Sequence, residues 1–152
     1  LTKADIKVNA GAGDDTIKVG VPGGTFTLGN GKDIIDVSKA AVEVGKINVA
    51  DGAIKTTITD IEKGDVIKGL SGTLFANANV GGANNLDEAL DIAAKGSGGN
   101  VTWFQYAGKT YIVDDIAAGA ALAATDIVIE LNGTVNLGSS TFDAGADTLT
   151  IG

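Results

Sequence analysis

The chain has 152 residues and a formal net charge of -8, and all eleven of its basic residues are lysine. This acidic balance argues against nucleic acid and anionic lipid as partners, and it favours divalent cations; the alternative is an acidic surface that serves solubility alone. Cysteine, methionine and histidine are absent, which excludes a disulfide framework, thiolate chemistry and histidine-based zinc or general-base sites. No apolar run approaches the roughly 18 residues that a membrane span needs, so membrane insertion is not expected.

A nine-residue repeat organises the chain between Val8 and Val44. Two segments, Gly11–Ile17 and Gly29–Ile35, share the pattern G-x-G-x-D-x-I, and their aspartates lie 18 positions apart. Apolar residues keep the nine-residue step in two series, which are Val8, Ile17, Phe26, Ile35 and Val44, and Val19, Leu28 and Val37. A fixed period with glycine and aspartate at fixed offsets is the signature of a repeat architecture.

The spacing predicts short strands that stack as successive coils. Glycine permits the positive φ angles of tight turns and lets carbonyl groups crowd together. Strands are expected within Leu1–Val8 and at Thr16–Val19, Thr25–Leu28 and Ile34–Val37. Stacking then places Asp15 and Asp33 on one edge, one above the other. Oxygen-rich turns of this kind suit Ca²⁺, which takes about 6–8 oxygen ligands; the alternative is ordinary Asp/Gly turns that bind no metal.

These segments resemble the RTX family of calcium-binding nonapeptide repeats, G-G-x-G-x-D-x-U-x. The resemblance implies a parallel β-roll or β-helix with calcium between neighbouring turns. The metal-site residues that it implies are Gly11, Gly13, Asp15, Gly29, Gly31 and Asp33. Ala10 and Leu28 replace the first glycine of the two copies, and the unit Gly20–Phe26 lacks the aspartate. One ion between two turns is therefore expected, rather than a long ladder of ions.

The segment Thr59–Ile67 reads as strand, turn and strand, with Gly64 in the turn. It resembles the "TDF-x-x-GD-x-I" segment that often closes the calcium roll of proteins exported by bacterial type I systems. Asp60 and Asp65 are accordingly candidate ligands of a second ion; the alternative is two solvated turn aspartates. Between the nonads and this segment, short strands without calcium turns are expected at Val42–Val44, Ile47–Val49 and Ile54–Ile58.

One helix is predicted after a loop over residues 76–85. Asn84 or Asn85 caps it, and acidic residues occupy its first turn. Its apolar face comprises Leu86, Ala89, Leu90 and Ala93. The helix is expected to run to about Lys95, to stop at Gly96–Gly99 and to cover one open end or face of the β structure.

Two hairpins are predicted in the last third of the chain. Val101–Tyr106 and Thr110–Asp114 flank Ala107–Lys109, whereas Asp126–Leu131 and Thr134–Leu137 flank a type I′ turn at Asn132-Gly133. The first hairpin holds the single tryptophan and both tyrosines. Aromatic side chains in a hairpin favour a role in the core, and the alternative is a patch that binds sugar.

The segments Trp103–Val113 and Asp126–Leu137 resemble the C-terminal module of type I-secreted surface-layer proteins. The shared patterns are "F-x-Y-x-G-x-T-Y-I-V-x-D" and "T-D-I-V-x-x-L-x-G-T-V-x-L". The resemblance covers most of the chain from Asp60 onward. It also implies an uncleaved export signal at the extreme C-terminus, which the low charge and apolar alternation of residues 138–152 fit.

Catalytic chemistry is not expected. Serine and threonine have no base to activate them, and the glycine-rich segments do not match a phosphate-binding loop. Two carboxylates can in principle cleave glycosides, but the pairs Asp14/Asp15 and Asp114/Asp115 are adjacent in sequence and point to opposite faces of an extended chain.

The sequence therefore predicts a mainly β protein: a calcium-binding parallel β-roll or β-helix over residues 1–70, then antiparallel strands with one short covering helix over residues 71–152. The expected function is structural, namely calcium-dependent folding and self-assembly of a secreted bacterial S-layer or surface-filament protein. The expected partners are calcium ions, further copies of the chain and the type I secretion machinery, and the expected location is the cell surface. The alternative is a calcium-stabilised secretion tail of an exported protease, lipase or adhesin.

Overall fold

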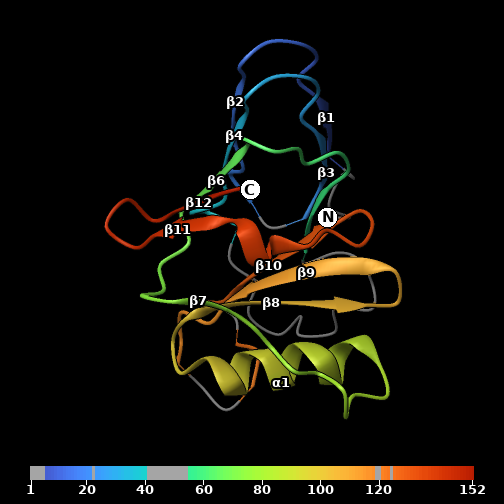
Figure 1. The fold of residues 1–152 in the computed structure, drawn as a ribbon, viewed down its shortest axis with the longest axis vertical. Helices are drawn as coiled ribbons and strands as arrows, with labels where there is room; N and C mark the ends of the chain where they lie inside the picture. Colours follow the sequence, from blue (N-terminus) through green and yellow to red (C-terminus); the bar gives the residue numbers. More distant parts are fainter. Residues whose placement is uncertain (1–5, 22, 41–54, 119–120, 124) are drawn as a thin grey trace.

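A computed structural model describes residues 6–21, 23–40, 55–118, 121–123 and 125–152. The described chain is mainly β, with two mixed sheets and one α-helix, as the sequence predicts (Figure 1). The seven-stranded sheet contains, in spatial order, β1 (Lys7–Asn9), β3 (Thr25–Thr27), β5 (Thr56–Ile58), β10 (Ile127–Leu131), β9 (Lys109–Asp114), β8 (Val101–Tyr106) and β7 (Phe75–Asn77). The five-stranded sheet contains β11 (Thr141–Asp143), β12 (Thr148–Thr150), β6 (Val66–Lys68), β4 (Ile34–Asp36) and β2 (Thr16–Lys18).

The first six strands alternate between the two sheets. Strands β1, β3 and β5 lie parallel in one sheet, and β2, β4 and β6 lie parallel in the other. Lys7 pairs with Thr25 and Thr16 with Ile34, so one coil takes 18 residues. From the second coil to the third, paired residues lie 32 positions apart in both sheets, as Thr25 and Thr57 do. The third coil therefore begins 14 residues later than an 18-residue period would place it, and the additional residues lie between β4 and β5.

The periodic apolar residues form two rows across the facing sheets. In the seven-stranded sheet the row runs Val8, Phe26, Ile58 and Leu131, and in the five-stranded sheet it runs Ile17, Ile35, Ile67, Leu149 and Phe142. These residues belong to one core cluster, together with the second periodic series, Val19, Leu28 and Val37. The nine-residue step therefore predicts the core positions correctly; Val44 lies outside the described residues.

The C-terminal region extends both sheets at the third coil. Strand β10 pairs parallel with β5, and β12 pairs antiparallel with β6. The two parts of the chain therefore share both sheets and one core. Beyond β10, the hairpin β8–β9 continues the seven-stranded sheet, and its turn, Ala107-Gly108, has positive φ at both residues.

Helix α1 (Leu86–Ser97) covers the face of β8 and β9 at the end of the molecule opposite to β1 and β2 (Figure 1). Asn85 is its N-cap and accepts a hydrogen bond from the Glu88 N–H, and Gly98 ends it in the left-handed conformation. A second core cluster joins the predicted apolar face of the helix to Phe104, Tyr111 and Val113. No helix in the described part of the chain is long and apolar enough to cross a membrane.

Two sequence predictions are wrong in detail. The loop expected over residues 76–85 begins with a strand, β7, which pairs with β8. The hairpin expected around Asn132-Gly133 does not form, because β10 already has β5 on one side and β9 on the other. Residues 134–136 are instead irregular and lead into a 3₁₀ helix, Leu137–Ser139. The strands expected at Val42–Val44 and Ile47–Val49 lie outside the described residues.

Candidate metal centre

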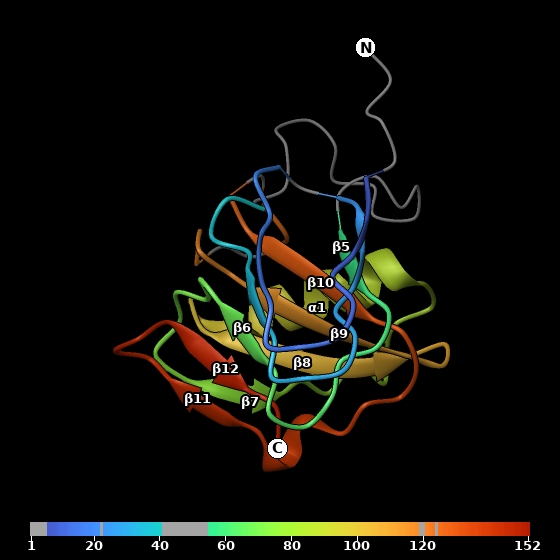
Figure 2. The ribbon, with the colours of Figure 1, turned by 90° about the horizontal axis from the view of Figure 1, so that it is seen from above.

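Three turns stack on one side of the coils. They connect β1 to β2, β3 to β4 and β5 to β6, and Figure 2 shows them as successive blue, cyan and green loops. The first two turns bond directly through their main chains. Gly13 N donates to Asn30 O at 2.8 Å, and Asn30 N donates to Gly11 O at 3.1 Å. The predicted stacking of the two G-x-G-x-D turns is therefore present.

The glycines of the second turn are needed because the two turns approach so closely. Gly29 has φ of 101°, and a Cβ added there would lie 1.5 Å from Gly11 O. Gly31 has φ of 150°, and its Cβ would lie 2.3 Å from Gly13 O. Any side chain at either position would force the turns apart, and L-residues rarely adopt these φ angles. The carbonyl groups of Gly11 and Gly13 therefore point toward the next turn.

The aspartates that end the turns form a ladder between coils. Asp15 N donates to Asp33 Oδ1 at 2.8 Å, and Asp33 N donates to Asp65 Oδ1 at 3.0 Å. Asp33 and Asp65 are fully buried. Each carboxylate therefore fixes the turn of the coil before it, and the predicted placement of Asp15 above Asp33 is confirmed.

The ladder leaves two carboxylate oxygens without a hydrogen-bond partner. Oδ2 of Asp15 and Oδ2 of Asp33 are both inaccessible to solvent, and neither has a donor. A buried carboxylate oxygen without a donor carries a desolvation penalty of several kcal/mol unless a cation or a proton compensates it. The two orphaned oxygens lie in the two turns that carry the complete G-x-G-x-D pattern.

The third turn differs from the first two because both oxygens of each of its two aspartates already accept a hydrogen bond. Asp65 Oδ2 accepts from Glu62 N at 2.7 Å, in addition to the bond from Asp33 N to Oδ1. Asp60 accepts from Leu28 N at 2.7 Å and from Gly29 N at 2.9 Å. Asp65 is buried, so it is not a solvated turn residue. Both aspartates hold the second and third turns together, and neither has an oxygen left without a donor.

Asp14 also bridges the turns, a role that the sequence does not reveal. Its Oδ1 accepts from Lys32 N at 2.9 Å, which adds a bond between the first turn and the second. Asp14 precedes the repeated aspartate, and the equivalent position in the second copy is Lys32. Because the two copies differ here, the repeat gives no signal that would identify this contact.

The atoms of the first two turns that could bind a metal ion are all oxygens, which fits a hard cation such as Ca²⁺. The candidate ligands are the orphaned oxygens of Asp15 and Asp33 and main-chain carbonyls of the glycine positions. Among the described residues, no cluster of three or more His, Cys, Asp or Glu side chains is placed to hold a metal. A site here would therefore combine two carboxylates with main-chain carbonyls.

A second group of buried carboxylates lies at the end of β9 and before β10. Asp114 accepts from Ser71 N at 2.7 Å, Asp115 accepts from Ser97 Oγ at 2.6 Å, and Asp126 accepts from Ala117 N and Ala123 N. Burial raises the pKa of both Asp114 and Asp126, and the neighbouring negative charges raise it further. Adjacent Asp114 and Asp115 accept hydrogen bonds from different partners, Ser71 and Ser97.

Comparison with protein-family models and with curated protein sequences finds no match to this chain. The functional conclusion therefore rests on the stacked turns and on the chemistry of their oxygen atoms.

Proposed function

We propose that strands β1 to β6 form a calcium-binding β-roll, and that the chain is a calcium-folded part of a secreted bacterial S-layer or surface-filament protein. One observation carries the proposal, namely the two buried carboxylate oxygens of Asp15 and Asp33 that have no donor. They lie in stacked turns whose glycine carbonyls face the next coil. A divalent cation held by these oxygens would neutralise both charges and satisfy their lone pairs.

Calcium binding at this place couples to folding. In the unfolded chain the ligand oxygens of the two turns are far apart and do not form a site. The free energy of ion binding therefore becomes free energy of folding. For a dissociation constant of about 10 µM, millimolar calcium is a hundredfold excess and adds about 2.7 kcal/mol. Submicromolar calcium adds almost nothing. A substrate of a type I secretion system needs this asymmetry, because it crosses the channel unfolded and folds outside.

The arrangement of sheet edges supports assembly as the purpose of that folding. Strands β5 and β6 are covered by β10 and β12, whereas β1 and β2 each lie at one end of their sheet within the described part of the chain. Outermost strands present main-chain groups that pair with another chain. The alternative function, a calcium-stabilised secretion tail of an exported protease, lipase or adhesin, uses the same ion and the same fold.

Thermal unfolding with calcium and with chelator tests the metal site. We expect 1 mM calcium to raise the Tm by roughly 5–10 °C relative to chelator, since 1 kcal/mol corresponds to about 2–4 °C for a domain of this size. Asp33→Asn and Asp15→Asn should each abolish most of this gain. Asp143→Asn is the matched control, because Asp143 is exposed and uses Oδ1 to accept from Gly145 N, a bond that asparagine keeps. Equal Tm values in calcium and chelator for the unmodified chain would refute the metal site.

Electron microscopy after calcium addition separates the two functions. Ordered sheets or filaments in millimolar calcium, dispersed again by chelator, are the result expected for a surface-layer protein. A strictly monomeric product that still shows the calcium-dependent Tm would favour the secretion tail.

A further inference from the structure

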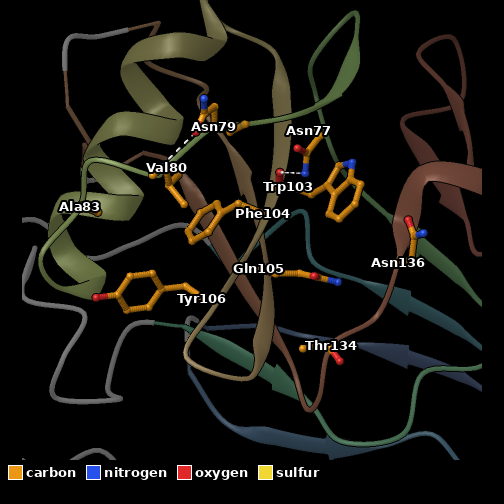
Figure 3. A pocket seen from close by; sticks show the side chains of 12 residues that line it. Asn77, Asn79, Val80, Ala83, Trp103, Phe104, Gln105, Tyr106, Thr134 and Asn136 are labelled. Atoms are coloured by element: carbon orange, nitrogen blue, oxygen red, sulfur yellow. Dashed lines mark hydrogen bonds between the residues drawn. The ribbon is translucent and has the colours of Figure 1, made fainter.

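A large open pocket lies at the free end of β8. Strand β7 stops at Asn77, opposite Trp103, so the last three residues of β8 extend past it. The pocket has a volume of about 1120 Å³, and its walls come from the segment after β7, the end of β8 and the segment after β10 (Figure 3). This exceeds the roughly 300–1,000 Å³ of sites for drug-sized ligands. The pocket therefore suits an extended ligand of several rings or residues.

The lining of this pocket is uncharged, although the chain has 30 charged residues, 11 basic and 19 acidic. Its polar side-chain groups are the amides of Asn77, Asn79, Gln105 and Asn136, the hydroxyls of Thr134 and Tyr106, and the indole N–H of Trp103. A site without charge in an acidic protein selects against ionic ligands, because it offers no partner to a charged group. The ligand should therefore be neutral and rich in hydrogen-bonding groups.

Each of the four amides is held by one bond to the main chain, which also fixes the positions of its oxygen and nitrogen. Asn77 Nδ2 donates to Trp103 O at 3.2 Å, and Gln105 Nε2 donates to Val135 O at 3.1 Å. Asn79 Oδ1 accepts from Gly81 N at 3.1 Å, and Asn136 Oδ1 accepts from Gly138 N at 2.9 Å. The opposite ends are left for a ligand: two carbonyl acceptors and two NH₂ donors. Hydroxyl groups, which both donate and accept, match this mixture.

Two aromatic side chains complete the pocket on either side of β8. Trp103 and Tyr106 are both half-buried, so part of each ring remains accessible. In Figure 3 the Trp103 indole lies beside Asn77 and on the side of Asn136, whereas Tyr106 lies on the side of α1. An accessible aromatic face offers an apolar platform next to fixed polar groups. The C–H face of a pyranose ring packs on such a platform while its hydroxyl groups reach the amides.

We propose that this pocket binds a neutral oligosaccharide. An extended peptide added to the edge of β8 is the other candidate, since the main chain of Gln105 faces the same side as that of Trp103. The segment after β7 argues against it. Val80 and Ala83 pack against the cluster that contains Phe104, so this segment covers the edge along which a peptide strand would run. The proposal does not depend on the calcium site, which lies in different elements.

The single tryptophan gives a direct readout of binding. We would screen an array of neutral oligosaccharides of two to six hexose or N-acetylhexosamine units in calcium buffer, with extended peptides on the same array. The best oligosaccharide would then be titrated while the emission of Trp103 is recorded. A saturable shift of this emission is expected, because Trp103 is the only tryptophan in the chain and lines the pocket.

Two substitutions test whether the fixed amides make the contacts. Asn79→Asp and Asn136→Asp each keep the Oδ1 acceptor bond, replace the free NH₂ donor with a carboxylate oxygen, and add one negative charge. Each should weaken oligosaccharide binding about fivefold to tenfold. Asn9→Asp, at an exposed position on β1, is the charge-matched control and should leave the affinity unchanged. The proposal is overturned if no oligosaccharide moves the Trp103 emission, if only peptides bind, or if all three variants bind equally well.

Discussion

The two parts of the chain reach a folded state by different means. Each of the described strands β1 to β6 has three residues, and the coils are held by turns that bond to one another through aspartate side chains and approach closely at glycines. Between β7 and β10 the strands reach six residues, and they pack against a helix through a second apolar cluster. The first part adds bonds between its turns to the core that it shares with the second part, whereas the second part has an apolar cluster of its own against the helix.

This difference determines what each part needs in order to fold. A three-residue strand is too short to be stable alone, so each coil relies on the next one. Asp33 and Asp65, which connect the coils, are buried, and the Oδ2 atoms of Asp15 and Asp33 have no hydrogen-bond donor. The hairpin β8–β9 and α1 bury large side chains such as Leu90 and Phe104 instead. We therefore expect perturbations of the turns to act on the coils and to leave the hairpin comparatively well protected.

The largest effect is expected from Gly29→Ala. Its Cβ would lie 1.5 Å from Gly11 O, and φ is 101°, so the substitution combines a main-chain clash with backbone strain. We expect a loss of about 3–5 kcal/mol in the free energy of unfolding, from overpacking and strain together. Urea denaturation in the presence of chelator measures this loss without the contribution of the ion.

Gly20→Ala is the matched control for this substitution. Gly20 belongs to the same coils, and an added Cβ would meet nothing within 4 Å. Its effect should stay within about 0.5 kcal/mol. Amide exchange of Gly29→Ala should show faster exchange in β2, β3 and β4 than in β8 and β9. Equal acceleration in both parts would mean that the chain unfolds as one unit and that the contrast between the two parts has no energetic meaning.

The regular spacing of the repeat makes the pairing of the first two coils predictable from the sequence. The partner of a residue lies 18 positions away, so Asp15 and Asp33 can be aligned without knowledge of any other part of the chain. The 14 additional residues before β5 interrupt this period. The alignment of Asp65 with Asp33, and the role of Asp60 as acceptor for the Leu28 and Gly29 amides, therefore leave no periodic signal.

The second part is predictable only where its contacts are local. The hairpin β8–β9 and the N-cap at Asn85 follow from neighbouring residues, and both are confirmed. The pairing of β10 with β5 joins residues more than 70 positions apart, such as Ile129 and Thr56. A turn signal such as Asn132-Gly133 describes local preference alone, so it fails where a distant strand already occupies the edge.

An intermediate effect is expected from Glu130→Gln, which removes the charge that links the two parts. Glu130 on β10 is buried and binds Lys55, which precedes β5, together with Lys109 and Tyr111 of β9. Loss of the carboxylate leaves two ammonium groups with a poorer acceptor. We expect a loss of about 2–4 kcal/mol at pH 7. Glu62→Gln, at an exposed position, is the control and should change stability by less than about 0.5 kcal/mol.

The pH dependence of this loss follows from the pKa of Glu130. Burial opposes its ionisation, but the hydrogen bonds from Lys109 and Lys55 lower its pKa below the ordinary value of 4.5. A lowered folded-state pKa gives stability that is present above pH 4.5 and is lost as the pH falls through the folded value. The difference between the unmodified chain and Glu130→Gln should therefore shrink below pH 4.5. Asp114 and Asp126 have raised pKa values and so change the stability with pH in the opposite direction, but they are present in both proteins and their effect cancels in this difference. A difference that grows on acidification would contradict this assignment of charge.

The smallest effect is expected from Asn85→Ala at the start of α1, and it tests the second part alone. Asn85 Oδ1 accepts from Glu88 N at 2.9 Å, and the Glu88 carboxylate accepts in return from Asn84 N at 2.8 Å. Loss of the cap should lower the free energy of unfolding by about 1 kcal/mol. Because the cap lies in the part of the chain that packs by apolar contact, this loss should be the same in calcium and in chelator. Asn9→Ala, exposed on β1, is the control for loss of an amide. A loss for Asn85→Ala that depends on calcium would show that the helix and the stacked turns respond to the ion together, and the contrast between the two parts would then not hold.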